Sequence, residues 1–398
     1  MTRDELGSWL RLTLTAGVGN STARKLLASF GMPQSIFQQS TATLAQVVSL
    51  AQAQALSQTP LELPQLLDVT WNWLQAGTEN PHEPEWRCVA TLGDSAYPAS
   101  LLDMEDPPLL LYMRGARHWL RAEHTPGQAT QEIAQTLLHH SLSRGIAVVG
   151  SRNPTPQGLI NARDFAHSLC QAGLTVVSGL ALGVDGAAHD GALAGLGEKP
   201  SHLGTIAVVG TGLDRVYPQA HRELAHRIVE HGLIISEYAL GTPPVASNFP
   251  KRNRLIAGLT QGTLVVEAAL KSGSLITARL AAEQGKDVFA IPGSIHAVQS
   301  KGCHALIKQG AKLVECTQDV LEECGFPQAP VHVAVPEVPS PASTPLLAAL
   351  GHDPVGLDAL QARTGMDTAQ LQVELMTLEL EGHVGRLHGG LFQRLART

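Results

Sequence analysis

The chain has 398 residues, of which 44% are hydrophobic and 16% are charged, and its formal net charge at pH 7 is −7. Two or three folded domains fit this length at about 150 residues per domain, and the composition excludes a disordered or fibrous chain. Because no apolar run approaches the ~20 residues of a membrane span, and the polar start does not resemble a secretory signal, we expect no membrane association.

The five cysteines (positions 88, 170, 303, 316 and 324) show no C-x-x-C spacing. An odd number without that spacing argues against a disulfide framework and against a zinc site. We therefore expect a cytoplasmic protein without a bound metal. The negative net charge disfavours nucleic acid as a partner only on average, since it can conceal a local basic patch.

Residues 1–75 are predicted to form a small helical domain. A glycine turn, Ala16–Gly19, leads into a helix with Asn20 or Ser21 as its N-cap. Two interpretations stay open. In a helix-hairpin-helix, the glycines let backbone N–H groups approach a phosphate at the helix N-terminus; the alternative is an ordinary turn between two helices.

Residues 85–322 are predicted to form an α/β domain, an extended Rossmann-like fold with a doubly wound, mostly parallel sheet. Short apolar runs at a regular spacing alternate with helical patterns such as 158–172 and 274–284, which is typical of βαβ units. The runs are apolar throughout, as in strands that are covered on both faces. The predicted strands are Gly145–Gly150, Leu174–Gly179, Thr205–Gly210, Gly232–Tyr238, Gly262–Ala268 and Lys286–Gly293.

The C-terminal part is predicted to be a linker followed by a winged-helix-like domain. Residues 323–344 are rich in proline, which indicates an extended linker. Residues 345–398 show three helical patterns and then a β-hairpin that turns at Gly389-Gly390. The third helix, 367–382, contains Glu374, Glu379 and Glu381 but no lysine or arginine. Since a helix that reads DNA is normally basic, a protein contact is at least as good an expectation for this domain as duplex DNA.

Motifs for the common enzyme chemistries are absent from the sequence. It has no G-x-x-x-x-G-K-[ST] loop for ATP and no G-x-G-x-x-G turn for a dinucleotide. It also has no G-x-S-x-G nucleophile elbow and no H-E-x-x-H zinc motif. We therefore predict a protein without catalytic residues and without a cofactor.

Anion-binding chemistry is better represented. The first predicted strand of the parallel sheet ends in Gly150-Ser151-Arg152, at the carboxyl edge where open α/β sheets bind ligands. Glycine permits close approach, serine can donate a hydroxyl, and the planar arginine fork suits a phosphate. Without further context, a loop with a surface arginine is the better explanation of these residues.

That context comes from the segment Asn248–Arg254, which reads Asn-Phe-Pro-Lys-Arg-Asn-Arg. Three cations (Lys251, Arg252 and Arg254) follow Phe249 on a turn fixed by proline. Cations next to an exposed ring are typical of proteins that hold single strands, because the cations meet phosphates and the ring stacks on a base. The alternative is a buried Phe249 at a solvated helix start.

A second helix start with affinity for anions follows at Lys271-Ser272-Gly273-Ser274, where amides, two hydroxyls and a glycine converge. Between positions 248 and 312 the sequence has nine lysines and arginines against three acidic residues. This basic segment within an acidic protein predicts a nucleic-acid-binding patch.

These motifs occur in an order that resembles the bacterial DNA-processing protein A family (DprA, also called Smf). The resemblance covers roughly residues 85–322. Its motifs are Gly150–Arg152, Ser178–His189, Ser236–Tyr238, Asn248–Leu259, Val265–Ala269, Ser272–Arg279 and Val288–Gly293. The helical N-terminal part resembles the sterile-alpha-motif-like domain of such proteins, and the C-terminal part resembles the winged helix of some members.

The resemblance implies a cytoplasmic, homodimeric, non-enzymatic protein of natural transformation. Such a protein binds incoming single-stranded DNA, works beside single-strand-binding protein and loads the RecA recombinase. Carried over to this sequence, the residues that bind the strand are Gly150, Ser151, Arg152, Gly179, Asn248, Phe249, Lys251, Arg252, Arg254, Ser272, Gly273 and Ser274. The terminal domains are left with double-stranded DNA or protein as alternative partners.

One departure from the family pattern and one alternative function stay open. Gly302-Cys303-His304 lies where many members have Gly-Thr-Asn or Gly-Ser-Asn, so the hydrogen bond of the asparagine is in doubt. The alternative is a nucleotide-processing enzyme related to the lysine-decarboxylase-like phosphoribohydrolases, with Gly262–Glu267 as its glycine turn and glutamate. The Pro-Gly-Gly-x-Gly-Thr run of those enzymes is missing here, which favours the binding protein.

Overall fold

The computed structural model describes residues 1–79, 85–116, 138–197, 202–326, 344–351, 354–387 and 389–396. These residues fall into two compact units, one made of Met1–Gly145 and Thr205–Thr260 and the other of Ile146–Gly204 and Gln261–Thr398. The predicted linker at 323–344 lies mostly outside the described residues. Among the helices that are described, none combines the length and apolarity needed to cross a membrane.

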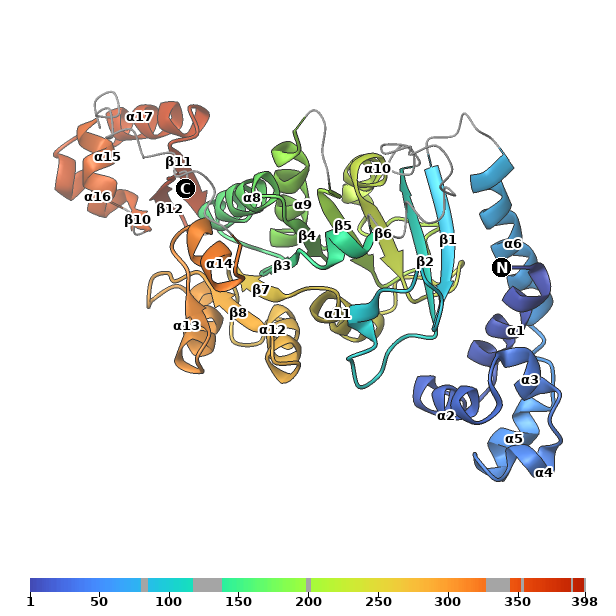
Figure 1. The fold of residues 1–398 in the computed structure, drawn as a ribbon. Helices are drawn as coiled ribbons and strands as arrows, with labels where there is room; N and C mark the ends of the chain where they lie inside the picture. The colour runs from blue at the N-terminus through green and yellow to red at the C-terminus, as the bar shows by residue number, and fades with distance from the viewer. Residues whose placement is uncertain are drawn as a thin grey trace. The chain divides into compact units, whose positions relative to one another are not determined.

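The first unit begins with six helices (Figure 1), as the sequence predicts for this part. A capping box starts the first helix, since Thr2 accepts from the Glu5 amide and Glu5 accepts from the Thr2 amide. The buried side chains of Leu6, Trp9 and Leu26 hold the helices together. The helices are α1 (Arg3–Leu14), α2 (Asn20–Phe30), α3 (Pro33–Phe37), α4 (Thr41–Leu44), α5 (Leu50–Leu56) and α6 (Leu63–Glu79).

The rest of the first unit contains four strands in the order β1-β2-β6-β5. Strands β5 and β6 run parallel, while β2 is antiparallel to both β6 and β1. The sequence analysis predicted β5 and β6 but missed the antiparallel pair β1 and β2. The elements are β1 (Glu85–Thr91), β2 (Leu110–Ala116), β5 (Thr205–Val209), α10 (Arg222–His231), β6 (Leu233–Ser236), α11 (Asn248–Gly258) and the 3-10 helices Ala99–Leu101 and Gln219–His221.

The second unit contains strands in the order β4-β3-β7-β8-β9, and its described pairs β3–β7, β7–β8 and β8–β9 are parallel. All six predicted strands are present, which confirms the α/β class. The strands are β3 (Gly145–Val149), β4 (Thr175–Ser178), β7 (Gly262–Val265), β8 (Asp287–Ala290) and β9 (Lys312–Leu313).

Helices cover both faces of these strands (Figure 1). Helices α8 and α9 pack over a core that includes Ile146, Phe165 and Leu264, while α12 and α13 lie on the other face. This two-sided cover explains why the strands are apolar throughout. The helices are α8 (Pro156–Gln171), α9 (Val184–Gly195), α12 (Ser274–Glu283), α13 (Lys301–Lys308), α14 (Thr317–Glu323) and the 3-10 helix Val298–Ser300.

The C-terminal part of the second unit has the three helices and the hairpin of the predicted winged helix. Its small sheet has the order β10-β12-β11. Leu346, Leu360, Leu375 and Phe392 are buried in a core of its own. The elements are α15 (Pro345–Leu350), β10 (Val355–Gly356), α16 (Leu357–Thr364), α17 (Thr368–Leu380), β11 (Val384–Leu387) and β12 (Leu391–Arg394).

Candidate nucleic-acid interface

In the first unit, the segment Asn248–Arg254 forms the start of α11. Asn248 is buried, and its side-chain amide donates to the carbonyl of Gly210, at 3.2 Å. The Tyr238 hydroxyl donates to the carbonyl of Asn248, also at 3.2 Å, and burial raises the pKa of this tyrosine. These two bonds fix the start of α11 against the loops that follow β5 and β6, so Asn248 orients the segment rather than presenting its own side chain to a ligand.

Phe249 pairs with a second ring, that of Tyr217. The two ring centroids lie 5.5 Å apart and the planes are tilted by 35°. Gly210 makes room for the pair, because a Cβ at that position would lie 3.2 Å from Cδ1 of Phe249. Tyr217 is 48% exposed and Phe249 is partly buried, so the pair presents aromatic surface to solvent. The sequence analysis missed Tyr217, since 32 residues separate it from Phe249 and no local pattern connects them.

The three cations of this segment differ in exposure. Lys251 is exposed. Arg252 is only 3% exposed, and its guanidinium donates to the carbonyl of Val208 in β5. Arg254 donates to the carboxylate of Glu237 and to the carbonyl of Asp106. In this structure Lys251 is therefore the cation of the segment that is placed to meet a phosphate, while both arginines bind other parts of the fold.

The carboxylates near Arg254 also contact the start of α2. The Asn20 side chain donates to Asp106 at 3.3 Å and to Glu237 at 3.1 Å. The predicted N-cap is wrong, because Gly19 occupies that position and Asn20 makes these tertiary contacts instead. Since two acidic side chains surround this helix start, the ordinary turn between helices fits better here than a phosphate site.

In the second unit, Gly150, Ser151 and Arg152 form the loop after β3. The Ser151 hydroxyl accepts from the amide of Asn153 at 3.1 Å, and the Ser151 carbonyl accepts from the amide of Val184 at 3.1 Å. A Cβ at Gly183 would lie 2.4 Å from that carbonyl oxygen, so only glycine fits the approach. The Arg152 side chain is exposed on this well-fixed loop.

Gly179 follows β4 and is buried. Its amide donates to the Asp185 carboxylate at 3.1 Å, as the amide of Ala181 does at 3.3 Å. Between them, Leu180 adopts a left-handed conformation with φ 59°. Asp185 thus holds the turn that precedes α9, and the Gly179 amide serves this turn rather than an open surface.

Ser272, Gly273 and Ser274 lie at the start of α12, beyond the end of β7. The two serine hydroxyls are 2.7 Å apart, and the N-cap, Gly273, has no side chain to cap the helix. A Cβ at Gly273 would meet nothing within 4 Å. The amides of Leu275 and Ile276 donate to the carbonyls of Ser272 and Gly273, at 3.2 and 3.1 Å, so they are already bonded within this turn. Because β7 lies beside β3 and runs parallel to it, the Arg152 loop and this segment leave the same edge of the second unit's strands.

Glu267, the glutamate of the enzymatic alternative, is bound to the start of α8. Its carboxylate accepts hydrogen bonds from the Thr155 amide at 2.9 Å and from the Thr155 hydroxyl at 2.5 Å. The same hydroxyl accepts a hydrogen bond from the Gly158 amide at 3.0 Å and so caps the start of α8. A Cβ at Gly158 would lie 2.4 Å from the Glu267 carboxyl carbon. Burial raises the pKa of Glu267. The Glu267 carboxylate is therefore fully engaged in hydrogen bonds to Thr155, the N-cap of α8.

Gly302-Cys303-His304, the departure from the family pattern, lies at the start of α13. Cys303 is fully buried, and burial raises the pKa of its thiol to about 12. The His304 Nε2 lies 3.0 Å from the Gly293 carbonyl oxygen, so the side chain at this position forms a hydrogen bond to the backbone. Gly302 is required here, since a Cβ would lie 2.5 Å from the Ala268 carbonyl oxygen.

The predicted residues thus form two clusters, one in each unit. The first is the start of α11 with Tyr217, and the second is the Arg152 loop with the start of α12. Each carries an exposed cation, Lys251 in the first and Arg152 in the second, on backbone that hydrogen bonds hold in place. Such an arrangement can bind phosphates in both clusters and stack bases in the first.

Comparison with known proteins gives two family models that match in sequence order. One, described as DNA recombination-mediator protein A, matches residues 135–325, and the other, described as the DprA winged helix domain, matches residues 328–390. The Smf protein of Escherichia coli is 40% identical over 311 residues, which are 76% of each chain. The Smf protein of Synechocystis is 30% identical over 99% of this chain and 100% of its own length.

A solved structure agrees with these matches. The crystal structure of DNA processing protein A from Streptococcus pneumoniae aligns with a TM-score of 0.61 and 33% identity, over 83% of this chain and 99% of that one. The similarity in sequence therefore extends to the fold, and it covers between 76% and 100% of the length of these three relatives. The chain belongs to the DprA/Smf family of DNA recombination-mediator proteins.

Proposed function

We propose that this protein binds single-stranded DNA without catalytic turnover and acts in the uptake and recombination of that DNA. The observation that carries the proposal is the partly exposed ring pair of Phe249 and Tyr217 beside the exposed Lys251. Rings that stack on bases and cations that follow the backbone are how proteins hold single strands without reading their sequence. The exposed Arg152 and the Ser272 hydroxyl at the start of α12 supply further groups that can bind phosphate.

The hydrogen bonds of Glu267 to Thr155 weigh against the alternative function, a nucleotide-processing enzyme. A glutamate that acts on a nucleotide must reach its substrate, whereas this carboxylate is bound by Thr155 and lies against Gly158. The experiment is incubation of the pure protein with nucleoside monophosphates. We expect no release of base, and steady release would favour the enzyme.

The proposal predicts a preference for single strands over blunt duplex. Bases in a duplex are stacked on one another and offer no free face to Phe249 or Tyr217. Competition titrations of the full chain at one fixed salt concentration measure this preference, because both affinities depend strongly on salt. Equal or tighter binding of the duplex would contradict the proposed site.

We further propose that the protein is a cytoplasmic homodimer that loads RecA onto strands covered by single-strand-binding protein. Membership of a recombination-mediator family supports this role. Two copies that bind one strand gain an effective concentration in the millimolar range, which strengthens the hold of a modest site. We expect earlier RecA filament formation on covered strands when the protein is present. An unchanged lag would count against loading, and a single-chain mass in light scattering would count against the dimer.

A further inference from the structure

A pocket of about 460 Å³ lies in the first unit, where α1 and α2 face the loop that joins β1 to β2. We call it the α1–α2 pocket. Its volume is within the range of about 300–1,000 Å³ that is typical of ligand pockets. Trp9, which is 2% exposed, and the buried Pro107 line its interior. Met32 and Leu102, each 54% exposed, line its edge, so the apolar lining continues to the surface.

Hydrogen bonds hold the walls of the α1–α2 pocket in place. In the β1–β2 loop, the Asp94 carboxylate accepts from the amide and the hydroxyl of Thr91, at 2.8 and 2.7 Å. The guanidinium of Arg24 in α2 donates to the carbonyl of Glu105 at 2.6 Å and so connects the helical wall to the loop. Because the pocket is already formed, a ligand does not have to order these walls when it binds.

The surface around the α1–α2 pocket is acidic. Residues 94–106 of the β1–β2 loop contain no lysine or arginine but four acidic residues: Asp94, Asp103, Glu105 and Asp106. The first three are exposed, and the side chain of the fourth is 49% exposed. Arg24, which lines the pocket, lies 3.8 Å from Asp106, and Lys25 follows it on α2. The acidic residues outnumber these two cations, so the surface attracts cations and repels phosphates.

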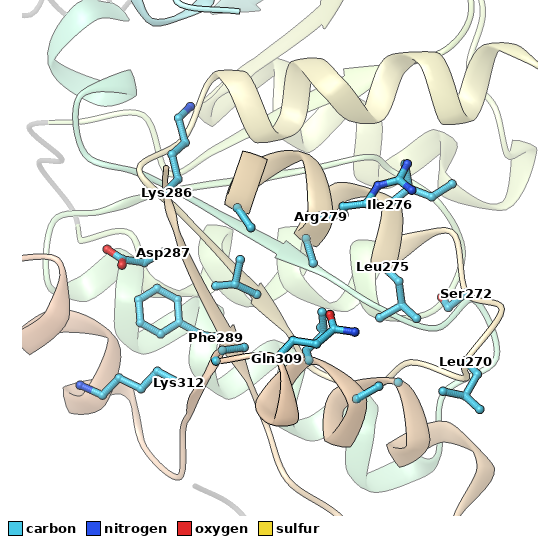
Figure 2. A pocket seen from close by; sticks show the side chains of 18 of the residues that line it. Leu270, Ser272, Leu275, Ile276, Arg279, Lys286, Asp287, Phe289, Gln309 and Lys312 are labelled. Atoms are coloured by element: carbon cyan, nitrogen blue, oxygen red, sulfur yellow. The ribbon is translucent and has the colours of Figure 1, made fainter. Parts of the chain in front are cut away.

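The cavity between α12 and α13 in the second unit carries charge of the opposite sign. Its volume is about 700 Å³. Figure 2 shows Phe289 and Leu275 between the two helices, with Lys286 and Lys312 at one end. Four cations line this cavity against two acidic residues: Lys271, Arg279, Lys286 and Lys312 against Asp287 and Glu323. Both cavities have apolar linings, so a basic ligand fits the α1–α2 pocket better than this one because of charge.

We propose that the α1–α2 pocket binds a basic segment of a partner protein. An apolar side chain of that segment enters the pocket, and its lysines or arginines lie against the acidic residues of the β1–β2 loop. An apolar anchor in a pocket with polar contacts around it is typical of protein interfaces. Nucleic acid does not fit, because its phosphates would meet Asp103 and Glu105. The lining contains no residue of the two candidate DNA-binding clusters, so the proposal does not depend on strand binding.

The proposal is tested with synthetic hexapeptides and the full-length protein. The probe has leucine and phenylalanine at its centre, two lysines on each side and a fluorophore. One comparison peptide has glutamates in place of the lysines, and another has serines in place of the two apolar residues. We expect both to bind at least about tenfold more weakly than the probe in fluorescence anisotropy, since each lacks one of the two kinds of contact. Absence of probe binding, or equal binding of either comparison peptide, would overturn the proposal.

Charge reversal beside the pocket has a matched control on α10. Asp103→Lys/Glu105→Lys should weaken probe binding by about tenfold or more, since like charges replace opposite ones. Glu223→Lys/Glu230→Lys makes the same change in net charge at two exposed positions of α10 and should leave the affinity unchanged. Equal loss from both would show a general effect of charge and contradict a specific site. Thermal melting establishes that each variant is folded, and Glu105→Lys against Glu230→Lys replaces the comparison where a double variant is unstable.

Two further measurements locate the apolar contact. Leu102→Ala should weaken probe binding by about fivefold or more, because it removes apolar surface that the probe covers. Leu61→Ala, at a 94% exposed position outside the pocket, should leave the affinity unchanged. A probe with a photoreactive analogue of phenylalanine should cross-link to peptides that contain Met32 or Leu102. Equal affinity of the two leucine variants, or cross-links confined to other parts of the chain, would overturn the proposal.

Discussion

Replacing Phe249 by alanine should weaken single-strand binding by about 5- to 150-fold, which corresponds to the 1–3 kcal/mol of one stacked base. The slope of log affinity against log salt should stay unchanged, because a ring releases no counterions. Tyr217→Ala should act in the same direction, since its ring lies 5.5 Å from that of Phe249. Fluorescence titrations at several salt concentrations give both quantities.

Lys251→Ala is the matched control for this prediction, two residues along the same helix. It should lower the affinity for all sequences and should also reduce the salt slope by about 0.7, the value for one phosphate on a single strand. Arg252→Ala should behave differently from both, because its side chain is buried and donates to Val208. We expect it to lose about 1–3 kcal/mol of stability, because the substitution removes this buried hydrogen bond to a charged group.

Thermal and chemical unfolding distinguish stacking from packing at Phe249. If the ring serves mainly the core, Phe249→Ala should lower the free energy of unfolding by about 3–5 kcal/mol, as for other buried aromatic side chains. A loss of that size with unchanged affinity would contradict the base-stacking role. A small loss of stability with clearly weaker binding would support it.

The sequence was sufficient for the parallel strands because their signal is local. Each strand such as β3 or β7 is a short apolar run that ends at a glycine or polar loop, and helical patterns fill the intervals. Strands β1 and β2 were missed because they are outside this alternation. Their pairing is antiparallel, with Glu85 opposite Ala116, and depends on contacts that no local pattern encodes.

The sequence was sufficient to predict which residue types make up the candidate site, but not which of their side chains are exposed. Arg252 and Arg254 are part of one basic run with Lys251, yet one is buried under β5 and the other is bound to Glu237. Sequence spacing cannot show this, because the partners Val208 and Glu237 are far away along the chain. For the same reason Tyr217 was missed, although it completes the ring pair.

Gly191→Ala should lower the free energy of unfolding by about 1–3 kcal/mol, the usual range for overpacking a close contact. A Cβ at Gly191 would lie 2.1 Å from the backbone oxygen of Arg163, and one at Gly195 would lie 2.4 Å from that of His167. Helix α9 therefore packs on α8 with backbone against backbone at these two positions. Both carbonyls belong to a helix, so neither can yield without shifting α8.

The sign of the change in unfolding free energy is informative, because the helix propensity of alanine stabilises the protein whereas the close contact between α9 and α8 destabilises it. Alanine favours the helix over glycine by about 1 kcal/mol, so a surface glycine in α9 would become more stable on substitution. Gly197→Ala, two residues beyond the end of α9, is the control for replacing a glycine without a steric contact, since a Cβ there meets nothing within 4 Å. Denaturant unfolding of the unsubstituted protein, Gly191→Ala and Gly197→Ala measures the three free energies of unfolding. A Gly191→Ala protein as stable as the control would show that α8 and α9 can move apart at little cost. In that case α9, whose Val184 amide holds the Ser151 carbonyl, would be too loosely packed to fix the Arg152 loop.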